Sequence, residues 1–133
     1  MARSFNFDTI DRRTKQVTPA LIDAVTDRIV QHLQPDQVLL FGSQADGRAT
    51  KESDIDLLVI LGNQHRLAAL QHRNRARTVL DLFRYRSFGL DALVVTEAEI
   101  QQLQAANEDE WNLVLEILAT GKSLYERTKE TTA

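Results

Sequence analysis

The chain has 133 residues, a mass of 15.1 kDa and a formal net charge of −3 at neutral pH, the size of a single domain with a modest core. Its 43% hydrophobic and 26% charged residues are typical of a soluble globular protein, and the absence of cysteine excludes disulfides and thiolate metal sites. The acidic total argues against a dedicated binder of duplex nucleic acid. The longest apolar run, Leu57 to Leu61, is too short to cross a membrane, and the first residues do not resemble a signal peptide, so we expect a cytoplasmic protein.

The first predicted helix follows an N-terminal stretch whose structure the sequence leaves open. Thr18 is typical of an N-cap, and Pro19 of the first helical position. Apolar residues then recur at helical spacing as far as Leu33, and Pro35 ends the pattern. We therefore expect a helix between these two prolines.

Two predicted strands flank a polar loop. A short apolar run over residues 37–41 predicts the first strand, and the run over 55–61 predicts the second, which the turn residues Gly62 and Asn63 end. Residues 42–53 between them predict a loop with a helical turn near its start.

Residues 65–85 predict a helix with a basic face. At 100° per residue, four arginines fall within one narrow stripe, namely Arg66, Arg73, Arg77 and Arg84. Such a stripe can contact an acidic partner, RNA or a triphosphate. It is equally consistent with a solvated helix face whose aliphatic stems cover the edge of the core.

The last third of the chain predicts a strand, two helices and an edge strand. Residues 90–95 form the third strand, and Thr96 with Glu99 matches a capping box that begins a helix to about residue 106. A further helix over about 108–120 ends at Gly121 in the C′ position. We expect it to bury Trp111, Val114, Leu115 and Leu118. Residues 123–125 add a candidate edge strand.

This order of elements indicates an α/β or α+β domain. We expect a small mixed sheet of three to four strands flanked by helices. The whole chain, residues 1–133, is predicted to be one domain, with 1–17 and 127–133 as candidates for flexible ends.

Three acidic residues are candidates for a metal site. Side chains alternate across a strand, so Asp54 and Asp56 point to the same side of the sheet, where their charges repel unless a cation lies between them. Asp91, near the start of the third strand, completes a cluster if that strand lies beside the second. Carboxylate oxygens suit Mg²⁺, and three such groups can hold two ions roughly 3.5–4 Å apart for phosphoryl chemistry.

Gly42 and Ser43 form a candidate seat for a phosphate chain. Glycine allows backbone N–H groups to approach an anion closely, and the serine hydroxyl adds a donor. A lone Asp-x-Asp or a lone Gly-Ser is more often a solvated turn. The functional interpretation depends on their combination: an apolar strand, Gly-Ser, ten residues, and Asp-x-Asp entering a second apolar strand.

The segment FGSQADGRATKESDIDLLVI resembles the signature of the polymerase-β-type nucleotidyltransferases, and most closely their minimal nucleotidyltransferase (MNT) branch, with its GSxARG and SDIDLLV motifs. The ending TGKSLYER is also similar. The resemblance implies the fold of that superfamily. It also implies Mg²⁺-dependent transfer of a nucleoside monophosphate from an NTP such as ATP to a hydroxyl, with release of pyrophosphate.

By match to the motif, Asp54 and Asp56 would bind both metal ions and Gly42 and Ser43 would hold the β- and γ-phosphates. Asp91 would be the third acid, by its place on the next strand. One position departs from the pattern, because Asp46 stands where the family usually has arginine. Arg48 is a candidate to compensate for it.

The MNT resemblance further implies an antitoxin that attaches AMP to a tyrosine of a HEPN-type toxin. Nucleic acid is not expected as the direct acceptor, and a homo-oligomer is an alternative state. Two other functions stay open: a non-catalytic module that masks a partner protein, and an enzyme that modifies a small molecule such as an aminoglycoside.

Overall fold

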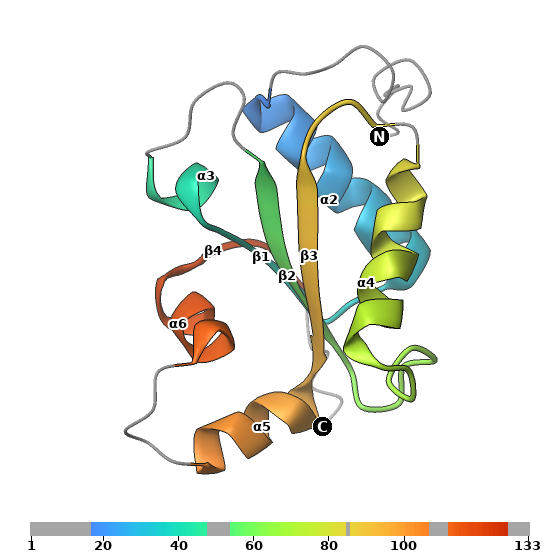
Figure 1. Cartoon of the computed structure of the whole chain (residues 1–133), viewed down its shortest axis with the longest axis vertical. Coiled ribbons are helices and arrows are strands. Elements are labelled where there is room, and N and C mark those ends of the chain that lie inside the picture. Colours follow the sequence, from blue (N-terminus) through green and yellow to red (C-terminus); the bar gives the residue numbers. More distant parts are fainter. Residues whose placement is uncertain (1–16, 48–53, 85, 107–111, 128–133) are drawn as a thin grey trace, which may run out of the picture.

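The computed structural model describes residues 17–47, 54–84, 86–106 and 112–127 (Figure 1). The elements in chain order are α2 (Pro19–Leu33), β1 (Gln37–Phe41), α3 (Ser43–Asp46), β2 (Ile55–Leu61), α4 (His72–Leu80), the 3₁₀ turn η1 (Asp81–Phe83), β3 (Leu90–Thr96), α5 (Glu97–Ala105), α6 (Leu113–Thr120) and β4 (Lys122–Glu126). The candidate flexible ends lie almost entirely outside this part of the chain, as do Arg48 and Trp111.

The four strands form one mixed sheet in the order β3-β2-β1-β4. β1 is antiparallel to both of its neighbours, whereas β2 is parallel to β3. Parallel neighbours need a crossover connection, and the segment containing α4 provides it. The predicted α+β fold with a mixed sheet is confirmed, including the edge strand at the end of the chain.

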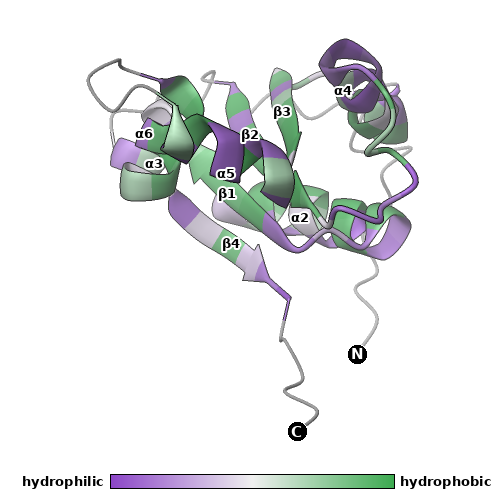
Figure 2. Ribbon diagram, turned by 90° about the horizontal axis from the view of Figure 1, so that it is seen from below, coloured by the Kyte–Doolittle hydropathy of each residue, from purple (hydrophilic) through white to green (hydrophobic). Residues whose placement is uncertain are grey.

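Helices cover both faces of the sheet, because alternate strand residues are buried on opposite sides. One face packs against α2 and α4, and its strand residues include Val38, Leu40, Ile55, Leu57, Val59, Ala92 and Val94. The other face forms a smaller cluster with α5 and α6, made of Leu39, Leu58, Ile60, Val95 and Ile117. In Figure 2 the strands β1, β2 and β3 are largely hydrophobic, whereas β4 is paler and α4 is strongly hydrophilic.

The predicted start of α2 is confirmed in detail. The Thr18 side chain accepts a hydrogen bond of 3.1 Å from the backbone N–H of Leu21, and Pro19 occupies the first helical turn. After Leu33 the chain turns through Gln34 in the left-handed region, at φ 49°. The helix therefore ends just before Pro35.

The prediction of one helix over residues 65–85 is wrong at its beginning. The segment before His72 forms successive turns, which are closed by short-range backbone hydrogen bonds and further held by the side chain of His65. His65 Nδ1 accepts from the backbone N–H of Leu67 at 3.0 Å, so its Nε2 is the donor to the Leu33 carbonyl at 2.6 Å. Arg66 therefore lies off the helix, and the four predicted arginines do not form one stripe.

The two C-terminal helices differ in how well they match the sequence. α5 has the predicted capping box, in which Thr96 and Glu99 exchange both hydrogen bonds. α6 begins at Leu113 behind an Asn112 cap and buries Ile117 completely. Three residues that were expected to be buried are only half-buried, namely Val114, Leu115 and Leu118.

Gly121 follows α6 for a steric reason and not for a left-handed turn. Its φ is −69°, a conformation open to any residue. A Cβ atom there would lie 2.6 Å from the Ile117 carbonyl oxygen and 3.2 Å from that of Leu40. Glycine thus lets the chain pass close to β1 before it enters β4. Across the described ranges, the helices are all too short or too polar to span a membrane.

Candidate functional site

The strand pairing brings the three acidic residues to one end of the sheet. Asp56 and Asp91 are Cα partners in the parallel β2–β3 pair, and Asp54 lies immediately before β2. Ile55 and Leu57 are buried in the core beneath α2, so Asp56 between them points to the opposite face. In Figure 1 this is the upper end, where β2 and β3 begin and α3 lies.

The electrostatics of this end are unfavourable for the protein alone. Burial raises the pKa of Asp56, and the negative charges of Asp91 and Asp54 raise it further. No basic side chain of the described segments forms an ion pair with any of the three carboxylates. The site therefore contains closely placed negative charges without a compensating cation, which is the electrostatic condition for binding one.

The three carboxylates are adjacent but do not converge. Asp54 Oδ1 lies against Gly89, Asp56 Oδ2 lies against Gly42, and Asp91 Oδ1 accepts from the backbone N–H of Ala92 at 3.0 Å. Within the residues that the structure describes, no three acidic or histidine side chains are placed together to ligate an ion. Asp54 and Asp91 are exposed and Asp56 is half-exposed, so side-chain rotation is sterically open to them.

Gly42 joins β1 to the short helix α3 next to these acids. It has φ 73° and ψ −157°, which glycine adopts at little cost. A Cβ atom at this position would lie 2.4 Å from Asp56 Oδ2. The backbone carbonyl of Gly42 accepts from Ala45 at 3.1 Å, which closes the first turn of α3. Ser43, the first residue of α3, is half-buried beside this turn.

The Gly-Ser turn and the acid pair are therefore neighbours in space as well as in sequence. Phe41, the last residue of β1, is the Cα partner of Asp56, so β1 leads directly from this pair into the turn. The start of a helix presents N–H groups that have no intrahelical acceptor, and these suit an anion. An anionic chain at Gly42 and Ser43 would lie beside the carboxylates, where a cation can bridge the two.

Gly89 also belongs to this site, although no sequence motif assigns it a role there. A Cβ atom at Gly89 would come within 1.8 Å of Asp54 Oδ1, and its carbonyl accepts from the N–H of Ile55 at 2.9 Å. Any larger residue would displace the Asp54 carboxylate. Its only signal in the sequence is a glycine immediately before the third strand.

Two further residues of interest come from the segment between β1 and β2, namely Asp46 and Lys51. Asp46, which replaces the family arginine, is exposed as the last residue of α3. Lys51, a lysine before the acid pair that could reach a phosphate chain, lies outside the described residues.

Sequence comparison decides which family this arrangement represents. Residues 24–130 match the profile of the family described as Polymerase beta, Nucleotidyltransferase. The chain belongs to this nucleotidyltransferase family. The matched segment contains β1, β2 and β3 with all five candidate residues. Nucleotidyltransferase domains use a nucleoside triphosphate and a divalent metal ion, which agrees with the anion turn and the uncompensated acids.

One solved structure resembles the fold more loosely. It is a candidate nucleotidyltransferase from Sulfolobus solfataricus, 23% identical in sequence, with a TM-score of 0.48 over 62% of this chain and 70% of that one. No curated protein sequence matches the chain.

Proposed function

We propose that this nucleotidyltransferase transfers AMP from ATP to a hydroxyl group in a Mg²⁺-dependent reaction. The observation that supports this most strongly is the position of Asp56. Its carboxylate lies against Gly42 of the anion turn, and burial and two neighbouring acids raise its pKa. A group in this environment is stabilised when a cation and a phosphate chain bind together.

Each residue then has a separate role. Asp54 and Asp56 hold the metal ions, and Gly42 and Ser43 bind the β- and γ-phosphates. The bound metal supplies Lewis-acid stabilisation of the phosphate oxygens. Asp91, on the neighbouring strand, accepts the proton of the attacking hydroxyl.

The reaction balances in one displacement. The acceptor oxygen forms a bond to the α-phosphorus of ATP, the bond from that phosphorus to the bridging oxygen breaks, and pyrophosphate leaves. The acceptor proton moves to a carboxylate oxygen of Asp91.

For the acceptor we propose a tyrosine hydroxyl of a HEPN-type toxin, which would make this protein its antitoxin. The support is the MNT-like sequence around Gly42 and Asp54 together with the acidic net charge of −3, which disfavours nucleic acid as acceptor. A module that only masks its partner is the second candidate. The exposed Asp46 in place of the usual arginine favours that alternative, because it adds a negative charge next to the phosphate seat.

The test is transfer of label from α-labelled ATP. The protein is incubated with Mg²⁺ and a co-purifying helical partner, beside an Asp56→Asn variant and a sample with chelator. Label on the partner that disappears in both controls supports the transferase. Tight partner binding without label in any sample contradicts it and supports the masking module, whereas label only on an added aminoglycoside identifies a small-molecule enzyme.

A further inference from the structure

A groove beside the candidate site follows the free edge of the sheet. Within the described part of the chain β3 pairs only with β2, so it is an edge strand of the sheet. The groove has a volume of about 540 Å³ and lies between α4, β3 and α5. Ala76, Leu93, Leu103 and Val114 give it apolar walls. Ala92 on its floor directly follows Asp91, so the groove begins where the candidate site ends.

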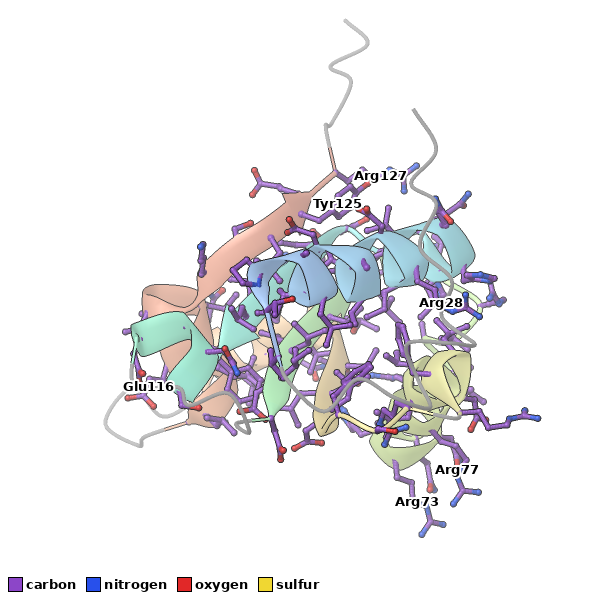
Figure 3. The ribbon with its side chains drawn as sticks, turned by 90° about the horizontal axis from the view of Figure 1, so that it is seen from above. Arg28, Arg73, Arg77, Glu116, Tyr125 and Arg127 are labelled. Carbon is purple, nitrogen blue, oxygen red and sulfur yellow. The ribbon has the colours of Figure 1, made fainter. Side chains whose placement is uncertain are left out.

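The rim of the groove on the side of α4 is basic. α4 contains three arginines and no acid over residues 72–80. Arg75 is buried and bound to Glu99 at 2.7 Å, which compensates the acid that lines the groove. Arg73, also in the lining, is exposed, and it points away from the body of the molecule together with Arg77 (Figure 3). Neither arginine forms an ion pair within the described residues.

The floor of the groove also offers backbone hydrogen-bonding groups. Because Ile55 donates to the Gly89 carbonyl, odd-numbered residues of β3 direct their N–H and C=O groups to β2, and even-numbered residues direct theirs outward. The Ala92 N–H is taken by Asp91 Oδ1, and the Val94 carbonyl accepts from Arg75 Nη1 at 3.3 Å. Among the residues that the structure describes, the Ala92 carbonyl and the Val94 N–H have no hydrogen-bond partner, so a ligand can pair with them.

We propose that this groove docks the acceptor segment of a partner protein, a short acidic peptide whose hydroxyl reaches Asp91. An apolar side chain of the segment fills the groove, and a carboxylate meets Arg73. The backbone of the docked peptide forms hydrogen bonds with the Ala92 carbonyl and the Val94 N–H. This inference rests on the proposed function for the role of the hydroxyl, but the binding of the peptide does not depend on catalysis.

A second copy of this chain is not the occupant that the charges favour. A symmetric pairing through the groove places the same surface of both copies face to face. The basic rims of both copies, each with Arg73 and Arg77, would then lie in one interface, and like charges gathered in an interface are destabilising. An acidic partner instead matches both the basic rim and the apolar walls.

Random copolymers provide probes of defined chemistry. Poly(Glu,Tyr) offers an acidic chain with tyrosine hydroxyls, and poly(Lys,Tyr) offers the same acceptor with the opposite charge. Binding is measured by fluorescence anisotropy without ATP, and transfer by labelling with α-labelled ATP and Mg²⁺. The variants are Arg73→Glu and, as a matched charge reversal outside the groove, Arg66→Glu. Arg66 is exposed and lies in the turns before α4.

We expect poly(Glu,Tyr) to bind and poly(Lys,Tyr) not to bind. Arg73→Glu should weaken binding and labelling by about tenfold because a rim charge is reversed, whereas Arg66→Glu should change both by less than about twofold. Leu103→Glu, which places a charge on the apolar wall, should abolish binding of poly(Glu,Tyr) while thermal denaturation shows an intact fold.

The outcomes separate the groove from the proposed function. Arg73-dependent binding without labelling supports the groove and contradicts the transferase. Labelling of the native partner that is unchanged in Arg73→Glu and Leu103→Glu overturns the groove and leaves the transferase intact. Failure of poly(Glu,Tyr) to bind also overturns the proposal. So does sedimentation that shows a dimer of the wild type and a monomer of Arg73→Glu, because the groove would then bind a second copy of the chain.

Discussion

The two ends of strand β3 treat charge in opposite ways. At its beginning, Asp91 joins Asp56 and Asp54, and the pKa of Asp56 is raised by burial and by both neighbouring acids. At its other end, Glu99 caps α5, and a hydrogen bond from Arg75 is the main cause that lowers the pKa of Glu99. One end is left without a cation, and the other is fully compensated.

Arg75 shows what full compensation requires. It is 3% exposed and donates to the carbonyls of Leu67, Ala68 and Val94 as well as to both carboxylate oxygens of Glu99. All of its donor groups are thus used within the fold. The contrast shows that a charge paired in this way stabilises the fold. The acids at the other end form no ion pair within the described residues, so they can bind a cation.

The largest effect is expected from Asp56→Asn, which removes the central charge of the uncompensated end. Labelling activity should fall by about 10³-fold or more, the scale on which loss of a preorganised electrostatic contact reduces kcat. The same change should raise the Tm by a few degrees, because it relieves repulsion that serves only function. Labelling rates in Mg²⁺ and thermal melts in chelator are measured for both proteins, and a lower Tm of the variant would contradict this account of the site.

Arg75→Ala should break the compensated end. It removes the two charge-assisted hydrogen bonds to Glu99 and those to the carbonyls of Leu67 and Ala68, which should lower the free energy of unfolding by about 3 kcal/mol. Arg77→Ala on the same helix is the matched control, since Arg77 is exposed, and should stay within about 0.5 kcal/mol of the wild type. Urea denaturation measures both, and equal effects would show that the buried pair is not structural.

Gly42→Ala tests whether the uncompensated end depends on close approach. The new Cβ atom would meet Asp56 Oδ2 at 2.4 Å in a conformation with φ 73°. Displacing the carboxylate by a fraction of an ångström should reduce activity by about 10- to 100-fold. Gly62→Ala is the control, because its Cβ atom would have its nearest neighbour at 3.6 Å. Similar losses of activity in both variants would show that the close approach of Gly42 to Asp56 is not needed for activity.

The smallest effect is the pH dependence of stability, which should have opposite signs at the two ends. The raised pKa of Asp56 means that its contribution to stability is present below the unfolded value of 3.8 and lost as pH rises through the folded pKa. The lowered pKa of Glu99 means that its contribution is present above the unfolded value of 4.5 and lost as pH falls through the folded pKa.

Metal-free thermal melts between pH 3 and 7 measure this difference. At pH 7, Asp56→Asn should be more stable than the wild type and Glu99→Gln less stable. Both differences should shrink toward zero on acidification. If the Tm of both variants differed from that of the wild type in the same direction at every pH, the two ends of β3 would not differ in their electrostatics.

The strands and the acid cluster could be predicted from the sequence because they depend on local patterns. Residues 57–61 are continuously apolar, which predicts a strand buried on both faces, and alternation along the chain places Asp54 and Asp56 on one side of the sheet. The Thr96 capping box was likewise visible, since both of its residues lie within one helical turn. Only the pairing of Asp56 with Asp91 depended on an assumption about which strands are neighbours.

The rest depends on contacts between distant residues. Arg75 is 24 residues from Glu99, and arginine spacing alone gives no sign that this one is buried while Arg73 and Arg77 are exposed. The early start predicted for α4 failed because the bonds of His65 to Leu33 and Leu67 favour turns over helix. Gly89 could not be assigned to the site because its role is to leave room for Asp54, which only the packed structure shows.

The parallel register of β2 and β3 has a consequence for quality control during folding. A slip of one residue would turn Ala92 and Val94 out of the core and move Asp91 to the opposite face of the sheet. The mispaired chain would lose apolar burial and the acid cluster in the same step. Chains with a misaligned site are therefore also unstable chains, so the population that survives as folded protein has its three acids in register without any separate means of selecting for it.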